Sequence, residues 1–211
     1  MADTLTFYTN PMSRGRIIRW MLEEVGQPYE TVVLDYAASM KAPDYLAINP
    51  MGKVPAIKHG DTVVTECAAI CAYLADAFPQ AGLAPPPASK ARGTYYRWLF
   101  YAAGPVEAAV TNRSMGWEPP ADKQAMVGYG TYDHVVDTLE KALSPGPYIL
   151  GDQVSAADVY VGAHIGWGMQ FGSLPKRPAF EAYFARLAAR PAAKRAKEID
   201  DALIAAQKKP A

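Results

Sequence analysis

Residues 49–57 of the chain are Asn49-Pro50-Met51-Gly52-Lys53-Val54-Pro55-Ala56-Ile57, and this stretch decides the fold. Asn49-Pro50 marks a turn, and strand-forming residues begin at Val54. Pro55 lies at the entrance of that strand, where its missing N–H is tolerated because it owes no hydrogen bond to a neighbouring strand. Taken alone, Val54-Pro55 favours a plain boundary between turn and strand, because cis bonds are rare. Its meaning therefore depends on the elements around it.

Strand-like and helix-like patterns alternate on both sides of this stretch. The predicted elements are a strand at 5–8, a helix at 17–25 stopped by Gly26, a strand at 29–34, a short helix at 44–48, strands at 54–58 and 63–65 joined by the tight turn His59-Gly60-Asp61, and a helix at 68–78. The first three make a βαβ unit with a right-handed crossover, and the last three make a hairpin followed by a helix. This order predicts a thioredoxin-like domain over residues 1–79.

In the thioredoxin-like arrangement, the proline at this strand entrance is cis. A cis X-Pro bond costs only about 0.5–1 kcal/mol, so we expect a cis Val54–Pro55 bond here. Such a bond turns the backbone of Val54 outward, and an extended peptide can then pair with it as an added strand.

The rest of the chain has a different pattern. Residues 79–88 hold four prolines and a glycine, so a helix cannot cross them, and we assign residues 80–88 as a linker. Beyond it, the predicted helices cover residues 95–115, 123–143, 155–169, 179–189 and 192–206. The fold class is therefore an α+β thioredoxin-like N-terminal domain plus an all-α C-terminal helical bundle over residues 89–211.

Composition limits the function further. Apolar residues make up 50% of the 211 residues, and the 21 basic residues balance the 21 acidic ones, so neither nucleic acid nor a membrane is an expected partner. We see no signal peptide and no long apolar run, which predicts a cytoplasmic protein. Cys67 and Cys71 are four residues apart in an apolar stretch. We expect two small buried thiols in a reducing compartment, with no disulfide and no metal site.

A second candidate site begins ten residues beyond Pro55, at Thr65-Glu66-Cys67, where the last predicted strand of the domain meets its next helix. Helix N-termini present N–H groups that bind anions such as a carboxylate. Glu66 beside them can receive an ammonium group. The alternative is that Thr65 and Glu66 only cap the helix.

A third motif, Gly151-Asp152-Gln153-Val154-Ser155-Ala156-Ala157-Asp158, is a folding signal. Ser155 can cap the helix that follows, while Asp158 reaches back to the N–H of Ser155. Val154 and Val159 have the spacing of a hydrophobic staple. We assign this motif no catalytic role.

With these three motifs, the chain resembles the cytosolic glutathione transferase family, in its bacterial theta- and beta-like forms, over essentially its whole length. The resemblance implies glutathione as co-substrate, no metal, and a homodimer active in detoxification. In the family, the residue before the cis proline binds the cysteinyl backbone of glutathione, which corresponds to Val54 with Pro55. Lys53 and Lys41 are candidates to hold the glycyl carboxylate.

The resemblance also assigns the γ-glutamyl end of glutathione to Glu66 and Cys67. Family members usually carry serine at the second of these positions. Cys67 loses that hydroxyl contact while its backbone N–H remains, so we expect weaker binding of glutathione there.

The reaction requires a thiolate, whereas a free thiol has a pKa of about 8.5. A hydroxyl near a helix N-terminus can lower that pKa by about one or two units, so the activating group should lie between the first strand and the first helix. Tyr8, Thr9 and Ser13 compete for this role, and family classes use a hydroxyl or thiol at all three places. We favour Ser13, because it would lie beside the first turn of the helix and near the charges of Arg14 and Arg16. Tyr8 and Thr9 stay open as alternatives.

The electrophile pocket of the family lies between the domains and is lined by the first helices of the bundle. Tyr101, Met115 and Trp117 are candidates, although side chains at helical spacing often belong to a core.

We expect an enzyme that conjugates glutathione to a hydrophobic electrophile, with glutathione-dependent peroxidase activity as an addition. A non-catalytic glutathione-binding or stress-regulatory protein on the same fold is the alternative. The enzyme is favoured because the hydroxyls and Glu66 are both present. A glutathione-dependent isomerase fits less well, because residues 10–13 lack the Ser-Ser-Cys run of such family members.

Overall fold

The computed structural model of the chain describes residues 3–207, which group into two compact units. Residues 3–81 and 190–207 form the first unit, and residues 82–189 form the second. The all-helical region predicted over 89–211 differs from this grouping at its C-terminal end. The last helix, α9 (Pro191–Gln207), packs against α1 (Gly15–Val25) of the first unit.

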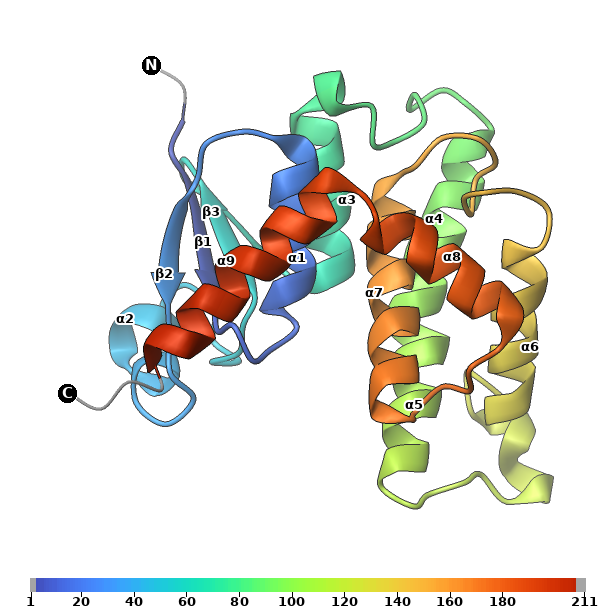
Figure 1. The fold of residues 1–211 in the computed structure, drawn as a ribbon. Coiled ribbons are helices and arrows are strands. Elements are labelled where there is room, and N and C mark those ends of the chain that lie inside the picture. Colours follow the sequence, from blue (N-terminus) through green and yellow to red (C-terminus); the bar gives the residue numbers. More distant parts are fainter. Residues whose placement is uncertain (1–2, 208–211) are drawn as a thin grey trace. The chain divides into compact units, whose positions relative to one another are not determined.

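The first unit is built on a four-stranded mixed sheet (Figure 1). Its strands are β1 (Leu5–Thr9), β2 (Glu30–Val33), β3 (Ala56–His59) and β4 (Thr62–Thr65), in the order β2-β1-β3-β4. Strand β1 is parallel to β2 and antiparallel to β3, which is antiparallel to β4. The helices are α1, α2 (Pro43–Leu46) and α3 (Cys67–Ala77), with short 3₁₀ turns at Ser39–Lys41 and Pro79–Ala81. The predicted order of elements and the thioredoxin-like fold are confirmed.

Alternation along β1 separates the two faces of the sheet. Leu5, Phe7 and Thr9 are buried on the face covered by α1, while Tyr8 points to the opposite face. Gly26 ends α1 in the left-handed region, at φ 71°, where a residue without a Cβ is unstrained. The segment between β1 and α1, residues 10–14, leaves the sheet at the C-terminal end of β1, which is an inner strand.

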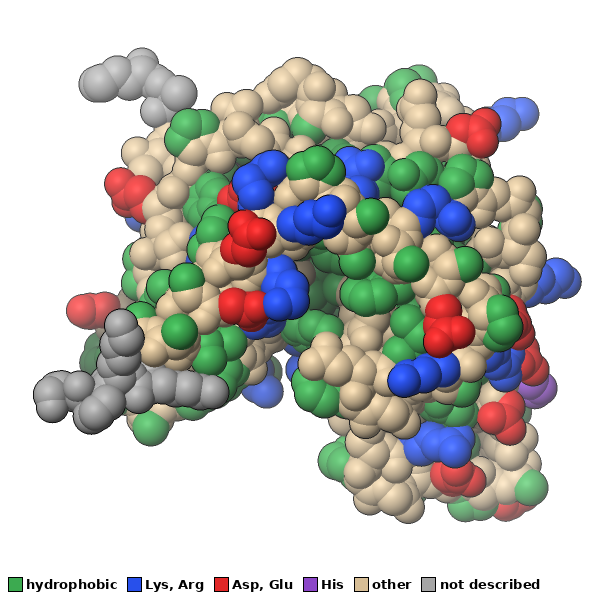
Figure 2. Space-filling view, in the orientation of Figure 1, with side chains coloured by type: hydrophobic (Ala, Val, Ile, Leu, Met, Phe, Trp, Pro, Cys, Tyr) green, Lys and Arg blue, Asp and Glu red, His purple; other side chains and the backbone are tan. Residues whose placement is uncertain are grey.

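Ion pairs fasten α9 to α1. Arg19 on α1 is buried and its Nε lies 3.2 Å from Oδ1 of the equally buried Asp200 on α9. Arg190–Glu24, Arg195–Glu23 and Arg16–Asp201 add pairs at 2.7, 3.1 and 2.8 Å. Figure 2 shows basic and acidic side chains next to one another along α9. These charges attach the C-terminal helix to the helix that begins beside Ser13.

The second unit is helical. Its helices are α4 (Ala91–Tyr101), α5 (Glu107–Ser114), α6 (Tyr132–Leu143), α7 (Ala156–Phe171) and α8 (Pro178–Ala188). A π-helical turn, Ala102–Val106, joins α4 to α5 and contains Pro105. Because proline lacks an N–H, the regular helical ladder cannot pass through it unchanged, and the predicted helix at 95–115 is interrupted there. No helix among residues 3–207 combines the length and apolar character needed to cross a membrane.

The predicted helix at 123–143 is wrong in its first half. Residues Ala121–Met126 form a 3₁₀ turn, and α6 begins only at Tyr132. Gly130 takes the left-handed conformation at φ 66°, and Thr131 is extended and caps α6 by accepting the N–H of His134 at 3.2 Å. A local backbone requirement thus overrides the helical spacing of the apolar residues.

The predicted capping box at the start of α7 is confirmed. Ser155 and Asp158 bond reciprocally, and the carboxylate of Asp158 accepts the N–H of Ser155 at 2.8 Å. It also accepts the N–H of Ile149 at 2.7 Å and the hydroxyl of Tyr183 at 2.8 Å. Burial raises the pKa of this carboxyl, although its hydrogen bonds lower it. Val159 is buried and Val154 is half-buried, and their staple contact stays a prediction.

Candidate functional site

The Val54–Pro55 bond is cis, as predicted. Val54 is half-buried just before β3 begins at Ala56. Within residues 3–207, neither its N–H nor its carbonyl makes a backbone hydrogen bond. Val54 therefore offers an unpaired donor and acceptor to an extended ligand.

The backbone before Val54 is held by two buried side chains. Asn49 Nδ2 donates to the carbonyl of Lys53 at 2.8 Å, and the hydroxyl of Tyr45 donates to the same carbonyl at 2.6 Å. Burial raises the pKa of Tyr45 to about 12, so it stays a donor at neutral pH. These contacts hold the peptide that leads into Val54 in one orientation.

Lys41 and Lys53 lie on the same part of the first unit. Lys41 Nζ donates to the carbonyl of Gly52 at 2.7 Å, and both lysines are exposed. Gly52 has φ 57°, and a Cβ there would approach Lys41 Nζ at 2.9 Å. The structure therefore brings the two predicted lysines to the turn that precedes Val54.

Glu66 has an unusual backbone. It occupies the N-cap position of α3 with φ 65° and ψ 119°, and it is the one residue other than glycine with positive φ in the described part of the chain. Its side chain is exposed and makes no capping hydrogen bond. Such strain costs about 1–3 kcal/mol and typically persists at functional sites. The predicted alternative, that Glu66 simply caps the helix with its side chain, does not describe this geometry.

Cys67 joins this helix start to the start of α1. Its thiol donates a long hydrogen bond to the carbonyl of Arg14, at 3.9 Å. Both cysteines are buried, as predicted, and burial raises the pKa of the Cys71 thiol. The candidate anchor Glu66–Cys67 is therefore next to the segment that contains Ser13.

Ser13 lies two residues before α1, as predicted. Its Oγ accepts the N–H of Gly15 at 2.9 Å and donates to the carbonyl of Asn10 at 2.6 Å. The side chain is partly exposed, so a ligand can reach it.

The two competing hydroxyls differ in accessibility. Thr9 has no exposed surface and its Oγ1 has no partner in the described residues; a Cβ on Gly15 would come within 2.0 Å of that oxygen. A ligand therefore cannot touch Thr9 in this structure. Tyr8 is half-buried, and its ring packs against Tyr45 with centroids 5.6 Å apart. Exposure thus argues against Thr9 and does not separate Ser13 from Tyr8.

The three candidates for the electrophile pocket do not come together. Tyr101 donates its hydroxyl to the carbonyl of Val135 at 3.2 Å and packs on Trp98, which are contacts of the helical core. Met115 is 70% exposed and lines neither of the two cavities described here. Of the three candidates, only Trp117 lines both cavities.

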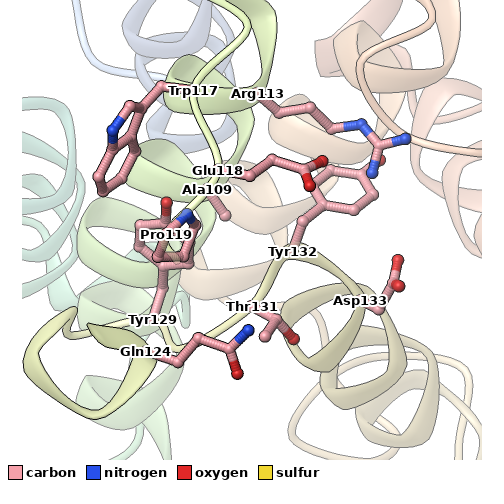
Figure 3. A pocket seen from close by; sticks show the side chains of 10 residues that line it. All are labelled: Ala109, Arg113, Trp117, Glu118, Pro119, Gln124, Tyr129, Thr131, Tyr132 and Asp133. Carbon is pink, nitrogen blue, oxygen red and sulfur yellow. The ribbon is translucent and has the colours of Figure 1, made fainter. Parts of the chain in front are cut away.

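Figure 3 shows the first cavity, which has a volume of about 210 Å³ and lies in the second unit. The Arg113 guanidinium stands 4.0 Å from the ring centre of Tyr132. The second cavity, of about 350 Å³, is more apolar and shares Trp117 and Tyr129 with the first. Sequence reasoning missed Tyr129 and Tyr132 because it placed both inside a helix. The glycines around them, Gly128 and Gly130, were the available signal.

No group of three or more His, Cys, Asp or Glu side chains in residues 3–207 is arranged to hold a metal ion. The first unit contains the unpaired backbone groups of Val54, a helix N-terminus with an acidic residue, and the hydroxyl of Ser13. Together they suit an extended zwitterionic peptide with a reactive centre near Ser13.

Comparison with known proteins identifies the class. Residues 3–76 match the glutathione S-transferase N-terminal domain, and residues 108–186 match the glutathione S-transferase C-terminal domain. A probable glutathione S-transferase of Oryza sativa, GSTF2, is 31% identical over 77% of this chain and 78% of its own length. The glutathione S-transferase GST-4.5 of Xanthomonas campestris is 26% identical over 88% of this chain and 93% of its own.

Solved structures agree. A glutathione transferase from Methylococcus capsulatus has a TM-score of 0.78 and 29% identity, covering 94% of this chain and all of its own. A glutathione transferase homologue from Sulfitobacter, with bound glutathione, has a TM-score of 0.75 and 29% identity over 93% of this chain and 98% of its own. The chain belongs to the glutathione S-transferase family, a family of transferases.

Proposed function

We propose that the chain transfers the thiolate of glutathione to a hydrophobic electrophile. The observation that carries this proposal is the strained, exposed Glu66 at the start of α3, in contact range of the Ser13 segment through the Cys67–Arg14 hydrogen bond. Strain retained at an exposed acidic residue is expected where a ligand uses that residue. The Sulfitobacter homologue with bound glutathione supports the choice of ligand.

Glutathione binds in extended form along the first unit. Its cysteinyl N–H and carbonyl pair with Val54, its γ-glutamyl ammonium meets Glu66, and its γ-glutamyl α-carboxylate meets the N-terminus of α3 near Cys67. Lys41 and Lys53 attract the glycyl carboxylate. This placement leaves the sulfur near Ser13.

Ser13 stabilises the thiolate by donating a hydrogen bond from its hydroxyl to the sulfur. The positive end of the α1 dipole adds to this effect. Arg16 contributes less than its charge suggests, because Asp201 neutralises it at 2.8 Å. The thiol proton leaves to solvent, the sulfur forms a bond to the electrophilic carbon, and the leaving group departs with the electron pair of the broken bond.

The electrophile is apolar. Of the three candidates for its pocket, Trp117 is the one whose aromatic side chain lines a cavity. The peroxidase activity, the homodimer, the cytoplasmic location and the role in detoxification belong to this proposal as expectations from the family resemblance.

Glu66→Gln is expected to raise the dissociation constant of glutathione about tenfold to hundredfold, because a hydrogen bond between charged groups contributes about 1.5–3 kcal/mol. Isothermal titration calorimetry with glutathione measures this. The control is Glu30→Gln, an exposed carboxylate on β2, which should leave the affinity within about twofold. Equal affinities for Glu66→Gln and wild type would remove Glu66 from the site.

Cys67→Ser is expected to tighten glutathione binding by about twofold to tenfold. The serine restores a hydroxyl donor beside the γ-glutamyl carboxylate, and such a bond contributes about 0.5–1.5 kcal/mol. The same calorimetry checks it, with Cys71→Ala as the control because Cys71 is fully buried. An unchanged or weaker affinity for Cys67→Ser would show that position 67 does not contact the ligand.

A non-catalytic glutathione binder is the second candidate. One observation favours it: the hydroxyl of Ser13 already donates its hydrogen bond to the backbone carbonyl of Asn10. Conjugation of glutathione to an aryl halide separates the candidates, because a binder would retain glutathione and show no turnover above the uncatalysed rate.

A further inference from the structure

The tripeptide Asn-Pro-Met occurs twice in the first unit, at residues 10–12 and 49–51, and both copies fold alike. Each asparagine is buried, with 3% and 5% of Asn10 and Asn49 exposed. Each Oδ1 accepts the N–H of the following methionine, at 2.9 Å for Met12 and 3.1 Å for Met51. Each Nδ2 donates to a backbone carbonyl. The two turns are therefore built by the same side-chain hydrogen bonds.

The two turns hold different parts of the site. Asn49 bonds to the carbonyl of Lys53, directly before the strand edge at Val54. Asn10 bonds to the carbonyl of Leu34 at 2.7 Å, which attaches the turn to the end of β2. The carbonyl of Asn10 also accepts two hydrogen bonds from Ser13, from Oγ at 2.6 Å and from the N–H at 3.1 Å.

We propose that Asn10 is a positioning residue for the thiolate, because its side chain fixes the turn that places the Oγ of Ser13 beside the sulfur. This inference rests on the proposed function, in which Ser13 faces the sulfur. The backbone carbonyl of Asn10 is the resting acceptor, and the side chain of Asn10 holds that carbonyl in place through Leu34 and Met12.

The strengths of the alternative hydrogen bonds explain how this works. A neutral thiol is a weak acceptor, so the hydroxyl stays on the carbonyl while the sulfur is protonated. A thiolate accepts a charge-assisted bond about twice as strong as a neutral one. The hydroxyl therefore turns about its Cβ–Oγ bond toward the sulfur only when the thiol loses its proton to solvent. The Ser13 proton itself stays on Ser13.

When the hydroxyl rotates toward the sulfur, no buried polar group loses its last hydrogen-bond partner. The carbonyl of Asn10 keeps the N–H of Ser13, and Oγ keeps the N–H of Gly15 at 2.9 Å. The thiolate gains one charge-assisted bond at the cost of one neutral bond, so the thiol pKa falls, but by less than it would if the hydroxyl had no resting acceptor.

The test compares Asn10→Ala with Asn49→Ala, the same substitution in the matching turn. For each variant, absorbance of the thiolate against pH gives the pKa of bound glutathione, and initial rates give kcat and KM. Asn10→Ala should raise the pKa by about 0.5–1 unit, because a turn released from Leu34 and Met12 no longer holds Ser13 Oγ beside the sulfur. It should lower kcat at neutral pH about twofold to eightfold, with KM for glutathione within about twofold. Asn49→Ala should raise KM about threefold to tenfold and leave the pKa unchanged, because it loosens the Val54 edge.

An Asn10→Ala variant with the wild-type pKa would overturn the proposal, and so would equal shifts of pKa and KM in the two variants. Circular dichroism verifies the fold. Asn10→Ser, which keeps an acceptor for the Met12 N–H, carries the same expectation if Asn10→Ala does not fold. Ser13→Ala distinguishes a failure of the role of Asn10 from a failure of the proposed role of Ser13. A raised pKa in Ser13→Ala beside a normal pKa in Asn10→Ala refutes only the role of Asn10, whereas a normal pKa in Ser13→Ala refutes the proposed function of Ser13 and this inference together.

Discussion

Asp158→Ala is expected to lower the free energy of unfolding by about 3–5 kcal/mol, which is the size seen when a buried charged network loses one member. The carboxylate of Asp158 accepts hydrogen bonds from the N–H groups of Ile149 and Ser155 and from the hydroxyl of Tyr183. Alanine leaves these donors buried without an acceptor, and each such group costs about 1–3 kcal/mol. Because domains are stable by only about 5–15 kcal/mol, a loss of this size is a large fraction of the stability.

Urea unfolding followed by circular dichroism measures the loss. The matched control is Asp152→Ala, an exposed aspartate in the same motif, which should change stability by less than about 0.5 kcal/mol. If Asp158→Ala and the control unfold at the same urea concentration, the network does not hold the start of α7.

The pH dependence of the same measurement has a defined sign. Burial raises the pKa of Asp158 in the folded state, so the folded protein binds this proton more tightly than the unfolded chain does. Stability contributed by this group is therefore full at low pH and falls as pH rises from the unfolded value through the folded pKa. The stability difference between wild type and Asp158→Asn should shrink or reverse in that direction.

Ser13→Ala is expected to raise the pKa of bound glutathione by about one to two units, toward the value of a free thiol near 8.5. At pH 7, a rise of one to two units that ends near 8.5 lowers the thiolate fraction about eightfold to twenty-five-fold, so kcat/KM should fall by a similar factor. The affinity for glutathione should change little, because its anchors are at Val54 and Glu66.

The controls for this prediction are Tyr8→Phe and Thr9→Ala. Tyr8 packs on Tyr45 and Thr9 is fully buried, so neither substitution should move the thiol pKa by more than a few tenths of a unit. Thiolate absorbance and pH–rate profiles measure all three variants. A wild-type pKa in Ser13→Ala together with a raised pKa in Tyr8→Phe would show that Tyr8, and not Ser13, activates the thiol.

Local signals explain what the sequence could predict. The alternation in β1, the glycine after α1 and the tight turn at Gly60 each act within a few residues, and the structure follows them. The proline at position 55 and the box formed by Ser155 and Asp158 are also short-range devices, and both are confirmed.

Long-range contacts and backbone strain explain what it could not predict. Arg19 and Asp200 are 181 residues apart, and no local pattern shows that they pair. The positive φ of Glu66 and the complete burial of Thr9 arise from packing around the start of α1 and α3. In the segment before α6, apolar residues keep a helical spacing, but the left-handed Gly130 and the extended Thr131 delay the start of the helix until Tyr132.

The central claim is that glutathione lies along Val54 with its γ-glutamyl end at Glu66. A crystal structure of the protein with glutathione tests it most directly. The account predicts that the cysteinyl N–H and carbonyl hydrogen-bond to the backbone of Val54, the ammonium group meets the Glu66 carboxylate, and the sulfur lies within hydrogen-bond distance of Ser13 Oγ. Glutathione bound elsewhere, or an empty edge at Val54 under saturating glutathione, would contradict it.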